Sequence, residues 1–145
     1  MGMKEEQARE YLQEAELTFI ASEGIFKQAK ETGRKLWAQV VKNAYDAMEH
    51  AISAALAYKG LFIPKEHPEK ITSFINNFNL RGSAIEKILT KWLGRRGKAQ
   101  YVDIRGGKIY VPHEIFNEND AEEAIEDARR IIGYVKNLLG INENM

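Results

Sequence analysis

Apolar side chains recur at intervals of three and four residues along most of the chain, which is the spacing of amphipathic helices. Residues 4–32 show this spacing first, and Gly33 is expected to end that helix, because glycine readily adopts the left-handed conformation found at many helix C-termini. Residues 34–58 predict a second helix, whose many alanines permit close contact with neighbouring helices. This composition places the second helix at the centre of the fold.

Two shorter helices are expected next. His67 and Pro68 open the first of them, because proline in the first turn lacks only an N–H that a helix leaves unpaired there. The other begins after Ser83, which forms a capping box with Glu86. In such a box each side chain satisfies a backbone N–H at the start of the helix.

The helical spacing breaks after the fourth helix, which we expect to end at Gly94 or Gly97. Residues 101–111 instead form two short alternating runs on either side of Gly106 and Gly107. A pair of glycines favours a tight hairpin turn, because both central residues of the turn need a positive φ. The sequence therefore predicts a short β-hairpin insertion near residues 101–111.

A fifth helix is expected after the hairpin. Asn119, with Glu122 three residues later, is expected to cap it, and Gly140 is expected to end it. Residues 141–145 would then form a frayed tail. The pattern as a whole predicts an all-α, five-helix fold with a small hairpin, in a single domain that spans residues 1–145.

Composition narrows the chemistry. The 145 residues include no cysteine, which excludes disulfides, thiolate metal ligands and cysteine nucleophiles, and which suits a reducing cytoplasm. No apolar run approaches the roughly 20 residues of a membrane span, and residues 1–16 are too polar for a signal peptide. We therefore expect a cytoplasmic protein that does not enter a membrane.

Charge is balanced overall, with 21 basic and 21 acidic side chains, but it is unevenly distributed. Residues 81–108 contain eight Lys or Arg and two acids, whereas residues 113–127 contain seven acids and no Lys or Arg. Two interpretations remain open. Either the two segments are solvated faces that attract each other, or the basic segment is a cationic patch for phosphate-bearing partners.

Three stretches of the sequence are similar to a known family. Residues 43–56 (NAYDAMEHAISAAL) form an alanine-rich helix with an aromatic residue and an Ala-Leu ending. Gly60, Pro64 and His67 mark the entry into the third helix at characteristic spacings, and residues 93–101 (LGRRGKAQY) carry Gln100 where aspartate is usual. In this order, the stretches resemble the HEPN family (higher eukaryotes and prokaryotes nucleotide-binding).

The resemblance implies an up-and-down helical bundle that pairs into a homodimer across a cleft. It also implies a role in nucleotide or RNA chemistry, with RNA or a nucleotide as the ligand. In prokaryotic toxin–antitoxin pairs such a domain often stands beside a small nucleotidyltransferase, which is the partner that the resemblance suggests here.

Active members of the family carry an arginine, four to six further residues, and then a histidine. Counted from Arg96, this spacing falls on residues 101–103, and counted from Arg95 it falls on residues 100–102. None of these positions is a histidine. The missing histidine favours a protein that is catalytically weak or inactive. If it is active, the resemblance implies a metal-independent endoribonuclease.

The end of the fourth helix carries the candidate phosphate contacts Arg95, Arg96 and Lys98. Guanidinium groups match phosphate oxygens, and the nearby Tyr101 could stack on a base. Cations near a helix C-terminus also interact favourably with the helix dipole, which is enough to explain one or two of them. For catalysis, Arg96 could stabilise a phosphorane-like transition state, but Tyr101 is a poor base because its ordinary pKa is about 10.

Histidines are the remaining source of a general base. His50 shares one helix face with Asn43 and Asp46, so it is either a hydrogen-bonded histidine of the core or an interface, or part of a site that faces Arg96. His67 is interpreted as a structural cap of the third helix, and His113, in a loop after Pro112, is the other histidine that could serve as a base. No two histidines have metal-ligand spacing with a third ligand nearby, so neither a metal nor a cofactor is expected.

Three functional hypotheses follow. The first is a nucleotide- or RNA-binding module that is catalytically weak or inactive, with Arg95, Arg96 and Lys98 on the phosphates and Asn43, Asp46 and Tyr101 beside the ligand. The second is a ribonuclease toxin that uses His50 as its base. The third is an interaction subunit for a nucleotidyltransferase.

Overall fold

The computed structural model describes residues 2–141, and within them the chain forms helices and one small hairpin. The elements in chain order are α1 (Met3–Thr32), α2 (Trp37–Tyr58), α3 (His67–Asn77), α4 (Ala84–Gln100), β1 (Asp103–Arg105), β2 (Lys108–Tyr110), α5 (Pro112–Ile115) and α6 (Glu118–Leu138). The all-α prediction is confirmed. The helix count is six in this part of the chain rather than five, because Pro112 begins a one-turn helix instead of only ending the hairpin.

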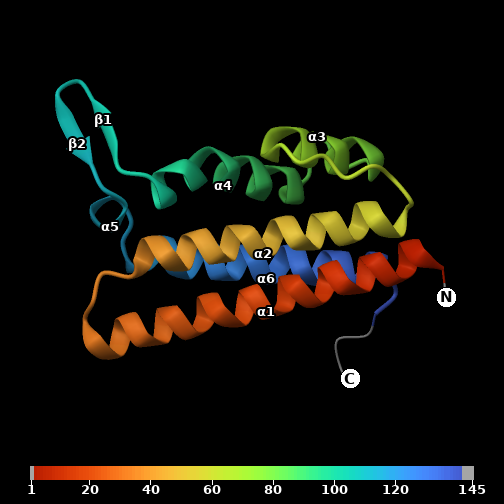
Figure 1. The fold of residues 1–145 in the computed structure, drawn as a ribbon, viewed down its shortest axis with the longest axis horizontal. Coiled ribbons are helices and arrows are strands. Elements are labelled where there is room, and N and C mark those ends of the chain that lie inside the picture. The colour runs from red at the N-terminus through yellow and green to blue at the C-terminus, as the bar shows by residue number, and fades with distance from the viewer. Residues whose placement is uncertain (1, 142–145) are drawn as a thin grey trace.

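Helix α2 is the centre of the bundle, as its alanines predicted. Figure 1 shows α3 and α4 along one side of α2, α1 along the other, and α6 behind it. Fifteen of the 22 residues of α2 are buried, whereas α1 buries five of its 30. The small side chains of Ala47, Ala51 and Ala54 are fully buried, which lets neighbouring helices approach closely. Side chains of α2 can therefore face α3 and α4 at once.

The hairpin has the predicted position and turn. Strands β1 and β2 pair antiparallel with Arg105 opposite Lys108, which leaves Gly106 and Gly107 as the two turn residues. Their φ angles are 57° and 78°, in the left-handed region that glycine accepts without strain. Figure 1 shows the hairpin projecting from the bundle beyond the end of α4.

Two predicted helix boundaries are wrong. Helix α4 does not end at Gly94 or Gly97 but continues to Gln100. Trp92 and Ala99 are both buried, so contact with the bundle holds the last two turns helical despite the glycines between them. Ser83 caps this helix as predicted: its Oγ accepts a hydrogen bond from the N–H of Glu86.

The last helix begins earlier than predicted. Its cap is Asn117 rather than Asn119: Asn117 Oδ1 accepts from the N–H of Asp120, and Asp120 Oδ2 accepts from the N–H of Asn117. Ala121 is fully buried in the first turn, so the helix must already be formed when it reaches the core. Residues 142–145 of the expected frayed tail lie outside the described residues. No helix between residues 2 and 141 is long and apolar enough to span a membrane.

Candidate functional site

A buried carboxylate, Glu49, lies where α2 meets α3. Its side chain is 7% exposed, and it accepts a hydrogen bond of 2.5 Å from the hydroxyl of Tyr45, one turn earlier on α2. From α3, His67 Nδ1 lies 2.5 Å from Glu49 Oε2, and Lys70 Nζ lies 3.2 Å from Oε1. These partners supply the hydrogen bonds and the positive charge that a buried carboxylate requires.

The same contacts determine the protonation states of Glu49 and Tyr45 on α2. Burial by itself raises the pKa of Glu49, but the Tyr45 hydroxyl, Lys70 and His67 together hold that pKa below its ordinary value. The pKa of Tyr45 is raised, first because burial disfavours the phenolate and then because its hydroxyl donates to Glu49. At neutral pH Glu49 is therefore ionised, and Tyr45 keeps its proton.

Arg96 reaches this region from α4. Its guanidinium carbon lies 5.9 Å from the centroid of the Tyr45 ring. The side chain is half-buried, and its Nε is buried without a hydrogen-bond partner. No carboxylate of residues 2–141 lies within ion-pair distance of Arg96, so its charge is uncompensated at close range.

Asp46 connects Arg96 with the predicted histidine. The pKa of Asp46 is raised chiefly by burial, and the cations Lys42 and Arg96 oppose that rise. Arg96 and His50 are both half-buried, and His50 lies one turn after Asp46 on α2. We call Tyr45, Asp46, His50 and Arg96 the Arg96 cluster.

Arg95 has a different environment from its neighbour. It forms a 3.2 Å ion pair with Asp120 of α6, and its guanidinium carbon lies 5.0 Å and 4.9 Å from the ring centroids of Trp92 and Phe116. Lys91, one turn earlier, pairs with Asp127 and Glu123, also on α6. Part of the basic segment therefore neutralises part of the acidic one and attaches α4 to α6, as the first interpretation of the charge pattern predicted.

The other predicted contact residues lie at the surface. Lys98 and Tyr101 are exposed, near the end of α4 and just beyond it. Asn43 donates its side-chain amide to the carbonyl of Gln39 on its own helix, at 2.8 Å. Of the residues predicted to share a site, Arg96 lies over the ring of Tyr45, the neighbour of Asp46, and Asn43 has a local partner instead.

Two interpretations of histidines need correction. The cap of α3 is Glu66, and His67 is the first helical residue, whose ring bonds Glu49 across the helix interface. His113 lies on the short helix α5 rather than in a loop, with its side chain half-exposed and Nε2 3.7 Å from Glu114. Both corrections have the same origin: a side chain's partner is set by packing between elements, and sequence spacing does not show it.

The sequence interpretation missed the central role of Glu49 and overlooked Tyr45 and Lys70. The sequence did contain a signal for Glu49 and Tyr45. Two ionisable residues four positions apart on an alanine-rich helix need hydrogen-bond partners within the protein when that helix is buried. The structure also describes no group of three or more His, Asp or Glu side chains that could hold a metal ion among residues 2–141.

The structure is a helical domain with the buried, alanine-rich helix α2 at its centre. Arg96 of α4 faces α2, and a polar cluster lies at this interface. A model of the HEPN domain matches residues 5–138, which is nearly the whole chain. The chain therefore belongs to the HEPN domain family, and the resemblance seen in the sequence is confirmed. No curated protein matches the sequence.

Proposed function

We propose that this HEPN-domain protein is a nucleotide- or RNA-binding module in which Arg96 contacts phosphate. One observation carries the proposal: Arg96 is half-buried and has no ion-pair partner among the described residues, whereas its neighbour Arg95 is paired with Asp120. The Nε–H of Arg96 is buried, but its terminal guanidinium nitrogens make no hydrogen bond within residues 2–141, so they can donate to a ligand anion. A phosphate diester suits it, because the planar fork of the guanidinium matches two phosphate oxygens.

The surroundings of Arg96 fit a polyanion. Lys98 lies two residues further along α4 and is exposed, so it can contact a neighbouring phosphate. Tyr101 is 61% exposed at the point where the chain leaves α4, so its ring is accessible for stacking on a base. Arg95 is not proposed as a phosphate contact, because its ion pair with Asp120 would have to break first.

Cleavage should be weak or absent. Residues 101–103, where the family's catalytic histidine would stand, are Tyr, Val and Asp. Tyr45 cannot replace it as a base, because its raised pKa keeps the hydroxyl protonated. Binding without efficient turnover is therefore the leading function.

A metal-independent ribonuclease is the second candidate, and one observation favours it. Arg96 lies over the ring of Tyr45, and His50 follows Tyr45 by five residues on the same helix, α2. A neutral imidazole there could accept the 2′-OH proton while Arg96 stabilises the phosphorane-like transition state. The products would be RNA fragments that end in 2′,3′-cyclic phosphate.

The proposal includes a homodimer in the cytoplasm, with a nucleotidyltransferase as the candidate partner protein. Exposed apolar side chains support an interaction surface. Ile104 and Ile109 pair across the hairpin and are 71% and 66% exposed. On α1, Leu17 and Ile20 are also exposed. Gel filtration with light scattering tests the dimer, and co-purification tests the partner protein.

The direct test is fluorescence anisotropy with a short labelled RNA, for wild type, Arg96→Ala and the matched control Lys87→Ala. Lys87 is an exposed cation on the same helix, nine residues before Arg96 and therefore on the opposite face of α4. We expect Arg96→Ala to weaken binding by about tenfold and to reduce the salt dependence by about one phosphate contact, whereas Lys87→Ala leaves both nearly unchanged. Equal affinities for all three proteins would contradict the proposal.

The same preparations distinguish the two candidate functions. RNA incubated with excess protein and EDTA should stay intact if the module only binds. Cyclic-phosphate fragments that disappear in His50→Ala and Arg96→Ala would establish the ribonuclease instead. Wild-type protein that does not bind RNA at micromolar concentration would leave the interaction subunit as the better hypothesis.

A further inference from the structure

A groove of about 390 Å³ runs between α1 and α6. Phe19 and Ile20 of α1 and Ile132 and Gly133 of α6 line its middle, and Ile20 is 60% exposed. Figure 1 shows α1 and α4 on opposite sides of α2, and the groove shares no lining residue with the Arg96 cluster. The groove is therefore separate from the candidate phosphate site.

Ion pairs join α1 to α6 along the groove and beyond its end. Each pair has one member on either helix: Glu16 with Lys136 at 2.9 Å, Glu23 with Arg129 at 3.2 Å, and Lys30 with Glu118 at 3.6 Å. Since the residue numbers rise along α1 while they fall along α6, the two helices run antiparallel. The six side chains remain between 21% and 53% exposed, so a second protein surface can still reach them.

This arrangement of charges is self-complementary. A two-fold axis parallel to the groove would place α1 of one copy on α6 of a second copy and keep each residue at the same height along the axis. Glu16 would then face Lys136 of the second copy, and the other two pairs would be matched in the same way, acid against base. At the middle, Ile20 would lie over Ile132 of the second copy, so apolar side chains meet there. A surface with a single sign of charge would match only one of the two helices.

The face is large enough for a specific interface. Helix α6 has 21 residues and is therefore about 31 Å long, and two adjacent helices are about 20 Å wide. Their product, on the order of 600 Å² per copy, reaches the lower limit for specific interfaces, about 600 Å² per partner. Gly133 has no side chain, which lets a second helix approach α6 closely.

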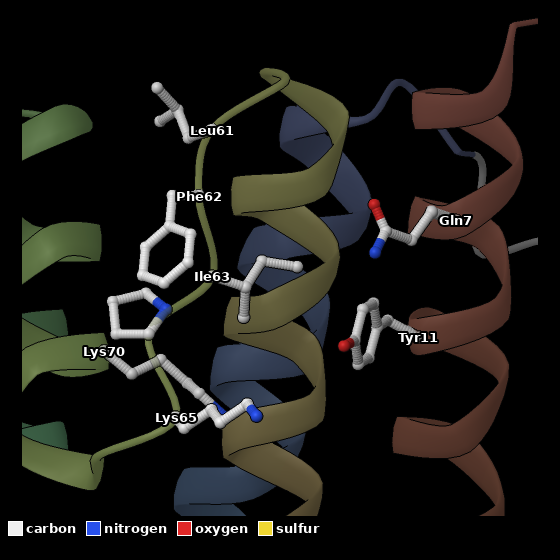
Figure 2. Close-up of a pocket in the computed structure, with 8 residues that line it drawn as sticks. Gln7, Tyr11, Leu61, Phe62, Ile63, Lys65 and Lys70 are labelled. Carbon is white, nitrogen blue, oxygen red and sulfur yellow. The ribbon is translucent and has the colours of Figure 1, made fainter.

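A cavity near the first turns of α1 lacks this match of charges. It measures about 580 Å³, and Figure 2 shows Gln7 and Tyr11 of α1 on one side of it and residues 61–65 on the other. Its charged lining residues are lysines, of which Lys70 is already paired with Glu49. No carboxylate of residues 2–141 lines this cavity, so it offers a second copy no acid for its own lysines. The α1–α6 groove is the better surface for self-association.

We propose that a second copy of the chain packs against the α1–α6 groove, related to the first by a two-fold axis along the groove. The inference rests on the homodimer of the proposed function and adds which face forms it. The HEPN resemblance implies pairing across a cleft, whereas this contact uses the helix on the side of α2 opposite α4. Each Arg96 cluster therefore stays open, and one dimer presents two phosphate sites.

Size-exclusion chromatography with light scattering tests the face, on wild type, Ile20→Glu and the control Ile104→Glu. Ile20 and Ile104 are both exposed, at 60% and 71%, so neither change disturbs the core. We expect wild type to be a dimer and Ile104→Glu to dimerise as wild type does. Ile20→Glu places a carboxylate in the apolar middle of the contact and should raise the Kd of dimerisation by at least about tenfold.

Charge exchange tests the two-fold axis itself. The variant Glu16→Lys/Glu23→Lys/Arg129→Glu/Lys136→Glu keeps both ion pairs within the chain and between identical copies, with their signs reversed. Against wild type it brings acid to acid and base to base, so heterodimers should be depleted. Native mass spectrometry of isotope-labelled wild type mixed with this variant should find heterodimers below about a quarter of all dimers, against about half at random, which is an exchange constant about tenfold lower.

Three results would overturn this inference. The first is a wild-type protein that stays monomeric at the highest soluble concentration. The second is a dimer that Ile104→Glu dissociates and Ile20→Glu does not, which would place the contact at the hairpin. The third is heterodimers at the random fraction. The loss of RNA binding in Arg96→Ala is measured independently of all three, so the two proposals fail separately.

Discussion

Replacing Glu49 with alanine removes the acceptor that Tyr45, His67 and Lys70 share at the interface of α2 and α3. The Tyr45 hydroxyl is then buried without its partner, and the ammonium of Lys70 loses the carboxylate that neutralises it. The His67 side chain is 37% exposed, so it can turn to water at little cost. The loss in stability should therefore come mainly from Tyr45 and Lys70.

The magnitude follows from burial. Removing one member of a buried ion pair destabilises a protein by about 3–5 kcal/mol, because the remaining charge stays desolvated. Lys70 borders an open cavity, so water can reach its ammonium, and we expect a value near the lower limit, about 3 kcal/mol. At roughly 2–4 °C for each kcal/mol in a domain of this size, Tm should fall by about 6–12 °C. Glu49→Gln keeps an oxygen acceptor for Tyr45 and should lose about half as much free energy.

Urea unfolding, followed by both far-UV circular dichroism and tryptophan fluorescence, measures the effect, and coincident transitions support a two-state treatment. Glu69→Ala is the matched control, since Glu69 is an exposed carboxylate on α3, and its loss should change stability by less than about 0.5 kcal/mol. A loss below about 1 kcal/mol for Glu49→Ala would refute the reasoning. It would mean that the three partners find water or one another as easily as they find the carboxylate.

Two further predictions concern pH and the corrected helix cap. The folded-state pKa of Glu49 lies below its ordinary value of 4.5, so its contribution to stability is complete above that pH and is lost as the pH falls through the folded pKa. Urea titrations from neutral pH down to about pH 3 should show this acid loss in wild type and a flatter curve in Glu49→Gln; parallel curves would contradict the assignment. Asn117→Ala should lower the unfolding free energy by about 1 kcal/mol through loss of the cap, whereas Asn119→Ala should change it by a few tenths, and the reverse order would contradict the observed cap.

The predicted elements that matched the structure rest on local physics. The three- and four-residue spacing of apolar side chains located the long helices, and Gly33 ends α1 in the left-handed conformation, with a φ of 72°. The Gly106-Gly107 turn was equally local, because few residues other than glycine accept two successive positive φ angles. In each case the residues that determine the conformation lie within a few positions of it.

The boundaries that failed depend on distant residues. Gly94 and Gly97 weaken a helix, but the burial of Trp92 and Ala99 against the bundle outweighs that weakness. Asn117 and Asn119 have similar local cues, each with an acidic residue three positions later, and the burial of Ala121 decides between them. Helix propensity favours neither of the possible boundaries strongly, so the free energy of packing determines where each helix begins or ends.

In the candidate site, too, some features follow from the local sequence and others depend on how the helices pack. By itself the sequence determined an all-α domain of the HEPN family, a central alanine-rich helix and an arginine pair without the following histidine. Only the tertiary structure paired Arg95 with Asp120 and left Arg96 without an ion pair among residues 2–141. Adjacent residues on a helix point about 100° apart, so two neighbouring arginines meet different elements. Which of them keeps its charge for a ligand depends on carboxylates that are close in space but distant in sequence, and these are positioned only when the helices pack.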